Sequence, residues 1–382
     1  MSDIRQTDRE YIANTYNRFD IEIESIENGY ASADGKEFID FGSGIGVNIF
    51  GAGDKEWIDA VCQQASILPH SSNLYYTRPC AELAKLLCEK TGMKKVFFGN
   101  SGAEANECAI KCARKYSYDK YGEGRKTIIT LENSFHGRTL LTLSATGQEV
   151  FHRYFGPFVE GFRYVPANDI DALKAALTDD VCAFMFECVQ GEGGVNALEK
   201  DYLAEAQKLC GEKDILMIVD EVQTGNGRTG TLYSYMQYDL SPDIVSTAKG
   251  LGGGLPIGAC LMGEKVRNTL NAGSHGSTFG GNPICCAGAL SVLSRLDEEF
   301  LGDVRARADY LWAKLSELKN IKSISGLGFM IGLEVEDSKS FISNCERMGL
   351  LVLSAKGKVR LLPPINVSRE TIDKAVRILS EA

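Results

Sequence analysis

ILMIVDEVQTGNGRTG, residues 215–230, and PDIVSTAKGLGGG, residues 242–254, form the stretch that decides the fold. The first segment opens with five consecutive apolar residues, 215–219. A run of this length suits a strand buried on both faces of a sheet better than an amphipathic helix. The strand ends at Asp220 and Glu221. Ligands of open α/β sheets bind at the carboxyl ends of strands, so this pair is a candidate for function as well as for capping.

Lys249 follows the apolar pair Ile244-Val245 and precedes a glycine-rich turn. An amine attacks carbonyl carbons only when it is deprotonated, and partial burial or a nearby positive charge lowers its pKa enough to allow this. Each residue alone has an ordinary explanation, because aspartate after a strand is usually a turn residue and lysine beside glycines usually lies on the surface. Together, Lys249 and Asp220 favour a pyridoxal phosphate site. The amine would hold the cofactor, and the carboxylate would keep its pyridine nitrogen protonated.

Three motifs resemble the signatures of the class III aminotransferases, which are fold-type I pyridoxal phosphate enzymes. They are DEVQTGNGRTG at 220–230, STAKGLGGGLPIGA at 246–259 and HGSTFGGNP at 275–283. The likeness extends from about Phe38 to the C-terminus. It implies an α/β protein with a large, mostly parallel sheet domain and a smaller α/β domain. The expected boundaries are 1–50 for an N-terminal segment that packs with the small domain, 51–282 for the large cofactor-binding domain, and 283–382 for a connecting helix and the small domain.

The alternation of strands and helices agrees with a parallel sheet that carries helices on both faces. From Asn282 the pattern is helical to about Lys319, and a smaller α/β unit follows. Strands are expected at 96–98, 127–131, 162–165, 182–186, 257–262, 321–325, 350–353 and 359–362, and helices at 80–90, 169–177, 201–210, 338–347 and 369–379.

The composition is that of an ordinary globular protein, with 44% hydrophobic and 24% charged residues in 382. A formal charge of −10 argues against nucleic acid or an anionic membrane as the main partner. The N-terminus carries charges of both signs and resembles neither a signal peptide nor a transit sequence. No apolar run is long enough to span a bilayer, and we expect a cytoplasmic protein.

The twelve cysteines are scattered and include no CxxC pair. Cys108 and Cys112 lie one helical turn apart, a spacing that two small core-facing residues explain better than a metal site does. We expect reduced core cysteines and no metal.

Ser101 and Glu104 predict a capping box at the start of a helix that follows a strand and a glycine. This arrangement is simply a good helix start, or it is a phosphate site built from free backbone N–H groups. It is not a P-loop, because the GKS/T ending is absent. The resemblance implies that Ser101, Gly102 and Ala103 hold the cofactor phosphate.

Around the cofactor ring, the resemblance places Phe135 on one face and Val222 on the other. Gln223 would contact the phenolic oxygen. Glu187 would line the cofactor side, and Glu221 is included among the cofactor-binding residues. His136 is expected to be structural.

For substrates, the resemblance implies that Arg138 binds a carboxylate through its planar set of donors. Arg360 would bind the α-carboxylate of glutamate or 2-oxoglutarate, and Glu192 would pair with it when the amino donor lacks that group. Ser277 would lie near substrate and Thr278 on the phosphate, both in the neighbouring subunit's site, which implies a homodimer.

Two departures from the family pattern are present. Gly51-Ala52-Gly53-Asp54 stands where relatives commonly carry a histidine-rich turn, which puts local contacts in doubt, and Cys188 stands where they usually carry proline.

The motifs favour transamination from N2-acetyl-L-ornithine to 2-oxoglutarate. Ornithine, succinylornithine, 4-aminobutyrate or the intramolecular shift of a semialdehyde aminomutase are alternatives with the same chemistry. A catalytically silent cofactor-binding protein and a nucleotide-binding oxidoreductase are alternatives of other classes, although no GxGxxG opens a helix with a following acid.

Overall fold

The largest element of the computed structural model, which describes residues 4–27 and 29–382, is a seven-stranded sheet. The predicted segment 1–50 therefore lies partly outside the described residues. Strands β11, β10, β7, β5 and β6 run parallel, and β12 is antiparallel to both of its neighbours. The predicted fold class, α/β with a mostly parallel sheet, is confirmed. In sheet order the strands are β4 (Lys95–Gly99), β12 (Gly258–Met262), β11 (Ile244–Thr247), β10 (Leu216–Asp220), β7 (Val181–Phe186), β5 (Thr127–Leu131) and β6 (Phe162–Val165).

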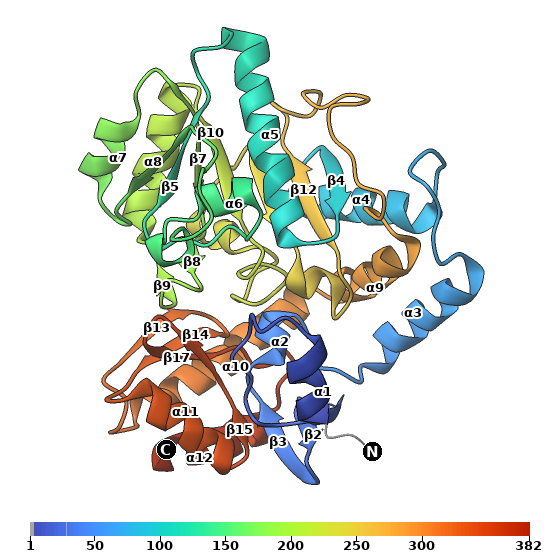
Figure 1. The fold of residues 1–382 in the computed structure, drawn as a ribbon, viewed down its shortest axis with the longest axis vertical. Helices are drawn as coiled ribbons and strands as arrows, with labels where there is room; N and C mark the ends of the chain where they lie inside the picture. Colours follow the sequence, from blue (N-terminus) through green and yellow to red (C-terminus); the bar gives the residue numbers. More distant parts are fainter. Residues whose placement is uncertain (1–3, 28) are drawn as a thin grey trace.

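Strand β10 is buried on both faces, as its apolar run predicts. Leu216 and Ile218 pack in one core cluster with residues of α5, whereas Met217 and Val219 pack in a second cluster with residues of α7 and α8. Successive side chains of a strand point to opposite faces, so helices cover the sheet on both sides. Figure 1 shows α5 crossing the front of this sheet. The helices of this part are α5 (Gly102–Tyr121), α6 (Leu140–Ala145), α7 (Ile170–Ala176) and α8 (Lys200–Glu212).

A smaller α/β unit follows, with sheet order β13-β14-β17-β16. The strand expected at 350–353 is in fact two short strands, of which β15 (Leu350–Leu351) leaves this sheet and pairs in parallel with β3. Figure 1 shows the resulting contact between N-terminal and C-terminal elements. The elements are β1 (Ile23–Glu27), β2 (Tyr30–Ala33), β3 (Lys36–Asp40), β13 (Ser323–Leu327), β14 (Met330–Glu334), β16 (Leu353–Ala355), β17 (Lys358–Leu361), α11 (Ser338–Arg347) and α12 (Arg369–Glu381).

The continuous helical run expected from Asn282 to Lys319 is wrong in one respect, because it divides into α9 (Pro283–Ser294) and α10 (Glu298–Ser316). Asp297 is the cause. Its side chain accepts a 2.8 Å hydrogen bond from Phe300 N and so starts a new helix. Helices α3 (Lys55–Ile67) and α4 (Arg78–Thr91) both pack against α9.

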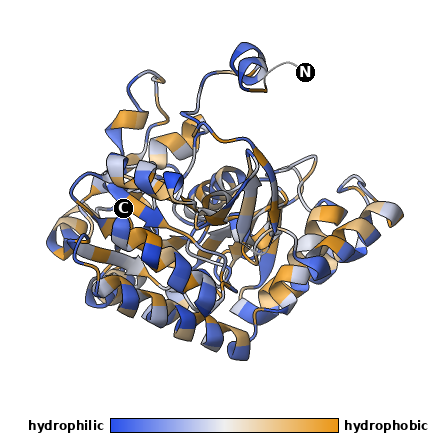
Figure 2. Cartoon of the chain, turned by 90° about the horizontal axis from the view of Figure 1, so that it is seen from below, coloured by the Kyte–Doolittle hydropathy of each residue, from blue (hydrophilic) through white to orange (hydrophobic). Residues whose placement is uncertain are grey.

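The remaining short elements lie mostly in loops. Helix α1 (Ile4–Tyr11) lies at the edge of the molecule near the N-terminus in Figure 2 and buries none of its residues, and its Arg5 forms a 2.9 Å ion pair with Asp34 of the β2–β3 turn. The short elements are α2 (Ser43–Gly46), β8 (Val189–Gln190), β9 (Asn196–Ala197), η1 (Glu149–Phe151), η2 (Ser234–Tyr238) and η3 (Lys249–Gly252).

The cysteines of the described residues are all free, and Cys108 and Cys112 are fully buried as expected. Cys62 is an exception to the expected core placement, because it is exposed on α3. Within residues 4–27 and 29–382 no group of three or more histidine, cysteine or acidic side chains is arranged to hold a metal ion. No helix in the same part of the chain is long and apolar enough to cross a membrane.

Candidate active site

A pocket of about 460 Å³ lies at the carboxyl ends of β10 and β11, between them and the start of α5. It brings together ten of the fifteen residues that the sequence singled out. These ten are Ser101, Gly102, Ala103, Phe135, Arg138, Glu187, Asp220, Val222, Gln223 and Lys249.

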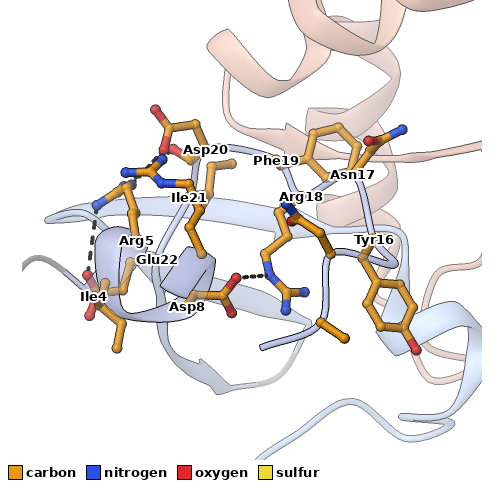
Figure 3. A pocket seen from close by; sticks show the side chains of 13 residues that line it. Ile4, Arg5, Asp8, Tyr16, Asn17, Arg18, Phe19, Asp20, Ile21 and Glu22 are labelled. Atoms are coloured by element: carbon orange, nitrogen blue, oxygen red, sulfur yellow. Dashed lines mark hydrogen bonds and ion pairs between the residues drawn. The ribbon is translucent and has the colours of Figure 1, made fainter. Parts of the chain in front are cut away.

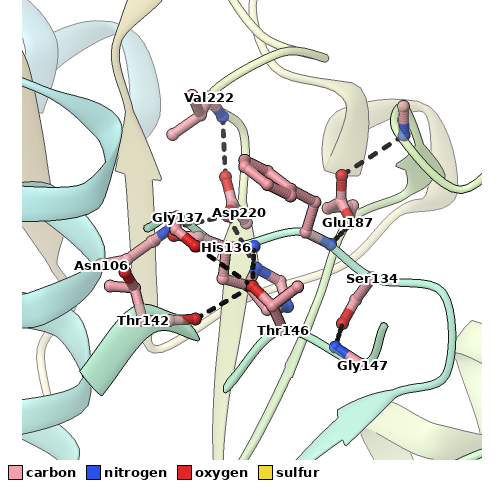
Figure 4. A network of polar contacts seen from close by, with 12 residues as sticks. Asn106, Ser134, His136, Gly137, Thr142, Thr146, Gly147, Glu187, Asp220 and Val222 are labelled. Atoms are coloured by element: carbon pink, nitrogen blue, oxygen red, sulfur yellow. Dashed lines mark hydrogen bonds and ion pairs between the residues drawn. The ribbon is translucent and has the colours of Figure 1, made fainter. Parts of the chain in front are cut away.

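Asp220 is buried at the base of the pocket and is held from two sides (Figure 4). Its Oδ2 accepts a 2.7 Å hydrogen bond from Asn106 Nδ2 and lies 2.8 Å from His136 Nδ1, while its Oδ1 accepts a 3.0 Å bond from Val222 N. An ionised carboxylate only accepts hydrogen bonds, so Nδ1 of His136 carries a proton. The orientation of Asp220 is therefore fixed. Asn106 has no distinguishing motif and was missed, because the helical pattern gives it only as one more residue of α5.

Lys249 lies two residues after the end of β11 and begins η3 in a left-handed conformation, with φ 45°. Only strongly supported backbone keeps a non-glycine residue in this region, and such residues cluster at functional sites. Burial and, to a lesser extent, the charge of Arg360 lower the pKa of Lys249 to about 8, against the opposing effect of Glu192. The amine is consequently deprotonated in part of the molecules near neutral pH, as a nucleophile or base requires.

The N-terminus of α5 forms another wall. Ser101 Oγ accepts a 3.2 Å bond from Glu104 N, which is half of the predicted capping box. The reciprocal half is shifted by one residue, because Glu104 Oε2 accepts from Asn100 N at 2.7 Å and not from Ser101. A Cβ at Gly102 would lie 2.7 Å from a methyl group of Val222, so only glycine allows this close approach. The first N–H groups of a helix lack intrahelical partners, which makes this wall suitable for an anion.

Glu187 lies buried behind the turn that carries Phe135. Its Oε2 accepts a 2.9 Å bond from Phe135 N, and its Oε1 accepts a longer one, 3.4 Å, from Gly191 N. Burial, together with the charge of Asp220, raises the pKa of Glu187 to about 7, although His136 opposes the shift. A buried acid with so high a pKa next to the pocket is typical of a functional site.

Arg360 and Glu192 lie behind Gln223. Arg360 Nη1 is 2.6 Å from Glu192 Oε1 and donates a 3.1 Å bond to Gln223 Oε1. Burial would raise the pKa of Glu192, but the charge and hydrogen bond of Arg360 together lower it. The charges of the two residues act on the pKa of Lys249 in opposite directions, since Glu192 raises it and Arg360 lowers it.

Five predicted residues do not line the pocket: Arg360 and Glu192, described above, and Glu221, Ser277 and Thr278. Glu221 is fully buried, but its carboxylate turns to the following loop, where it accepts bonds from Ser234 Oγ at 2.6 Å and Tyr235 N at 2.8 Å. Ser277 and Thr278 lie on a separate loop, where Ser277 Oγ accepts a 3.1 Å bond from Asn100 Nδ2.

At both departures from the family pattern, the residue present has a structural role. Asp54 caps α3 through a 2.9 Å bond from Trp57 N and forms a 2.8 Å ion pair with Arg295. Cys188 is fully buried in the main core cluster.

A further cavity, of about 490 Å³, lies within the N-terminal segment 4–22 (Figure 3). Two of its three lining arginines are paired with acids, Arg5 with Asp20 at 2.6 Å and Arg18 with Asp8 at 2.8 Å. It shares no lining residue with the pocket around Lys249.

The family profile described as Aminotransferase class-III matches residues 11–382. The chain is 51% identical to the acetylornithine aminotransferase of Haemophilus ducreyi, over 99% of this chain and 98% of the relative, and 45% identical to that of Aquifex aeolicus, over 97% and 99%. Among solved structures it resembles the ornithine aminotransferase of Toxoplasma gondii, with TM-score 0.93, 32% identity and coverage of 99% and 93%. It also resembles the N-acetylornithine aminotransferase of Stenotrophomonas maltophilia, with TM-score 0.84, 32% identity and coverage of 98% and 97%.

Proposed function

The chain belongs to the class III aminotransferases, and we propose that it transfers the side-chain amino group of N2-acetyl-L-ornithine to 2-oxoglutarate. The products would be N-acetyl-L-glutamate 5-semialdehyde and L-glutamate, which makes the reaction a step of arginine biosynthesis. The observation that supports this substrate most is the 51% identity over 99% of the chain to an acetylornithine aminotransferase. The chemistry itself is supported by the presence of Lys249 and Asp220 in one pocket.

The residues of the pocket fit pyridoxal 5'-phosphate, the cofactor of this family. The pocket offers a buried carboxylate, an amine with a lowered pKa and a helix N-terminus, which are the groups that a pyridine nitrogen, an aldehyde and a phosphate require. We propose that Ser101, Gly102 and Ala103 hold the phosphate. When bound, the cofactor supplies an aromatic ring that accepts electrons from the substrate carbon.

Asp220 and Lys249 would share the catalytic work. Asp220, oriented by Asn106 and His136, would keep a proton on the pyridine nitrogen through its negative charge. Lys249 Nζ would hold the cofactor, and would move a proton between substrate carbon and cofactor carbon once the incoming amine has displaced it. A pKa of about 8 suits both duties, because the amine can accept and return a proton near neutral pH.

The ring would be held by side chains on each side. We assign Phe135 and Val222 to its two faces, Gln223 to its phenolic oxygen and Glu187 to the wall behind Phe135. The carboxylate of Glu221 bonds to the following loop and not to the pocket, so we do not assign it a cofactor contact.

Two arginines would bind the carboxylates of the two substrates. Arg138 lines the pocket and would take the carboxylate of the amino donor. Arg360 would take the α-carboxylate of 2-oxoglutarate after its ion pair with Glu192 opens. The Arg360→Ala variant tests this step, because it should raise KM for 2-oxoglutarate far more than KM for the amino donor.

We further propose that the enzyme is a homodimer in the cytoplasm. A group of large apolar side chains is exposed on one loop, with Leu74 87% and Tyr75 72% accessible, and Asn73 ties this loop to the 277–280 loop by a 3.0 Å bond to Ser277 O. A second copy would cover this surface, and Ser277 and Thr278 would then reach its site. Sedimentation velocity tests this, since a monomer at micromolar concentration would contradict it.

A steady-state comparison of amino donors tests the substrate. With 2-oxoglutarate as acceptor, kcat/KM should be highest for N2-acetyl-L-ornithine among that compound, succinylornithine, ornithine and 4-aminobutyrate. A clear preference for ornithine would favour the second candidate, which the TM-score of 0.93 to an ornithine aminotransferase supports. A protein that binds the cofactor and turns over none of the four would be catalytically silent.

A further inference from the structure

Among the described residues, the guanidinium of Arg138 has no acidic partner. It is exposed and lines the pocket, and among the described residues it has no ion pair or hydrogen bond with a protein group. Its partners are two aromatic rings. The guanidinium carbon lies 4.1 Å from the centre of the Phe151 ring and 5.5 Å from that of Phe135.

This kind of contact leaves the guanidinium available. A carboxylate partner would occupy N–H donors at the edge of the group, whereas a ring contacts its flat face. All five N–H donors therefore stay free for a ligand, while the rings restrict the orientation of the side chain. A donor that is oriented before its ligand arrives loses less entropy on binding.

Phe151 comes from a segment that is tied to the turn carrying Phe135. Gln148 Nε2 donates a 3.0 Å bond to Ser134 O, and Asn133 N donates a 2.7 Å bond to Gly147 O. The Phe135 and Phe151 rings themselves meet edge to face, with centres 5.8 Å apart. The position of Phe151 thus follows that of Phe135, the residue assigned to the cofactor ring.

We propose that Phe151 is a positioning residue that fixes Arg138 for the carboxylate of the amino donor. This inference rests on the proposed function, because Arg138 acts on a substrate carboxylate only in a transaminase that uses amino acids. Phe151 itself contacts neither substrate nor cofactor in this assignment.

The test compares a donor that has the carboxylate with one that lacks it. N2-Acetyl-L-ornithine and its decarboxylated analogue N-acetylputrescine are each assayed with the holoenzyme and 2-oxoglutarate. In Phe151→Leu, KM for N2-acetyl-L-ornithine should rise about tenfold with kcat nearly unchanged, which is in the range expected for the loss of one cation–π contact. Catalytic efficiency with N-acetylputrescine should stay the same, because no carboxylate reaches Arg138.

Two variants serve as controls. Phe151→Tyr keeps the ring and should restore KM to within about twofold of the unaltered protein. Tyr154→Leu removes an exposed ring of the same segment, which is not in contact with Arg138, and should change neither donor. A thermal melt checks that every variant is folded.

Equal changes for both donors, or no change for either, would overturn the role of Phe151. If the unaltered protein uses a different α-amino acid, that donor and its decarboxylated form replace N2-acetyl-L-ornithine and N-acetylputrescine. The effect of Phe151→Leu on the two donors is then compared in the same way. If it turns over no amino acid, the proposed function fails, and the binding of N2-acetyl-L-ornithine to the holoprotein is measured by calorimetric titration. Binding that Phe151→Leu weakens about tenfold would still support the inference, whereas binding that it leaves unchanged, or no binding to the unaltered protein, would overturn it.

Discussion

Ionisable groups near the two ends of strand β10, some of them on neighbouring strands or loops, are in opposite situations. At the amino end, Asp214 accepts bonds from Lys120 Nζ at 2.7 Å and Tyr121 Oη at 2.6 Å. Burial alone would raise the pKa of Asp214, but these bonds and the charge of Lys265 lower it to about 2. At the carboxyl end, burial lowers the pKa of Lys249 to about 8 and raises that of Glu187 to about 7. The charged forms are stabilised at one end and destabilised at the other.

This difference distinguishes a structural cluster from a reactive one. Partners that satisfy a charge add to stability, whereas buried groups whose charged forms are disfavoured cost stability and gain reactivity. Substitutions near the two ends of β10 should therefore separate stability from activity.

The largest expected effect is on Lys249. Lys249→Ala should lower turnover by about 10⁴-fold, because both the attachment point and the proton carrier are lost. The matched variant is Lys265→Ala, whose amine lies 3.6 Å from Asp214 Oδ1 at the other end. It should keep turnover within about twofold and lower the free energy of unfolding by about 0.5–1 kcal/mol. Steady-state kinetics and urea unfolding of both variants measure the two effects. Substantial turnover in Lys249→Ala would contradict the catalytic role of Lys249.

Replacing each of two aspartates by asparagine also separates the effect on activity from the effect on stability. Asp220→Asn should lower kcat by about 10²–10³-fold, since the charge near the pyridine nitrogen is lost while the shape is kept. Asp214→Asn should leave kcat unchanged and cost about 1–2 kcal/mol of unfolding free energy. The same two assays decide, and the comparison breaks if Asp220→Asn proves the less stable and the more active of the two.

The cofactor-free protein should show the cost of burying Lys249. Its folded pKa of about 8 lies below the unfolded value of about 10.4, so between these pH values the unfolded chain binds more protons and stability rises with pH. Lys249→Ala should therefore be more stable than the unaltered protein by up to about 3 kcal/mol below pH 8, with the gain disappearing towards pH 10.4. Urea unfolding from pH 7 to 10.5 measures the difference, and a constant difference would contradict the assigned pKa.

The smallest effect is the acid dependence at Asp214. Its folded pKa of about 2 lies below the unfolded value of about 3.9, so its contribution is complete above about pH 4 and is lost as the pH falls towards 2. The penalty of Asp214→Asn, about 1–2 kcal/mol at pH 7, should accordingly vanish near pH 2. Urea midpoints of both proteins at several pH values test it, and a penalty that persists unchanged at pH 2 would mean that packing, not charge, is lost.

Much of the fold was predictable because the positions of the strands and their burial follow from local patterns in the sequence. The apolar run before Asp220 and the glycines after Lys249 indicated a buried strand and a tight turn, and both are present. The break between α9 and α10 was missed, because a helical pattern continues on both sides of Asp297.

The site was predictable in part. Residues in motifs were found, but the bond from Asn106 to Asp220 spans 114 residues of sequence and depends on how α5 lies across β10. The neighbours Asp220 and Glu221 look equivalent in sequence, yet they face different surroundings, since adjacent residues at a strand end point in opposite directions. Whether a carboxylate faces a pocket or a loop is set by the tertiary fold.

The pairing of β3 with β15 has a consequence for synthesis of the chain. The pairing of Ile39 with Leu350 forms only after Leu350 has been synthesised, on the order of 15 to 60 s later at typical translation rates. During that time β3 has an unpaired edge, which is open to proteases and to other nascent chains. We expect brief proteolysis of chains arrested before residue 350 to cut near residue 40, and the same site to be resistant in released protein.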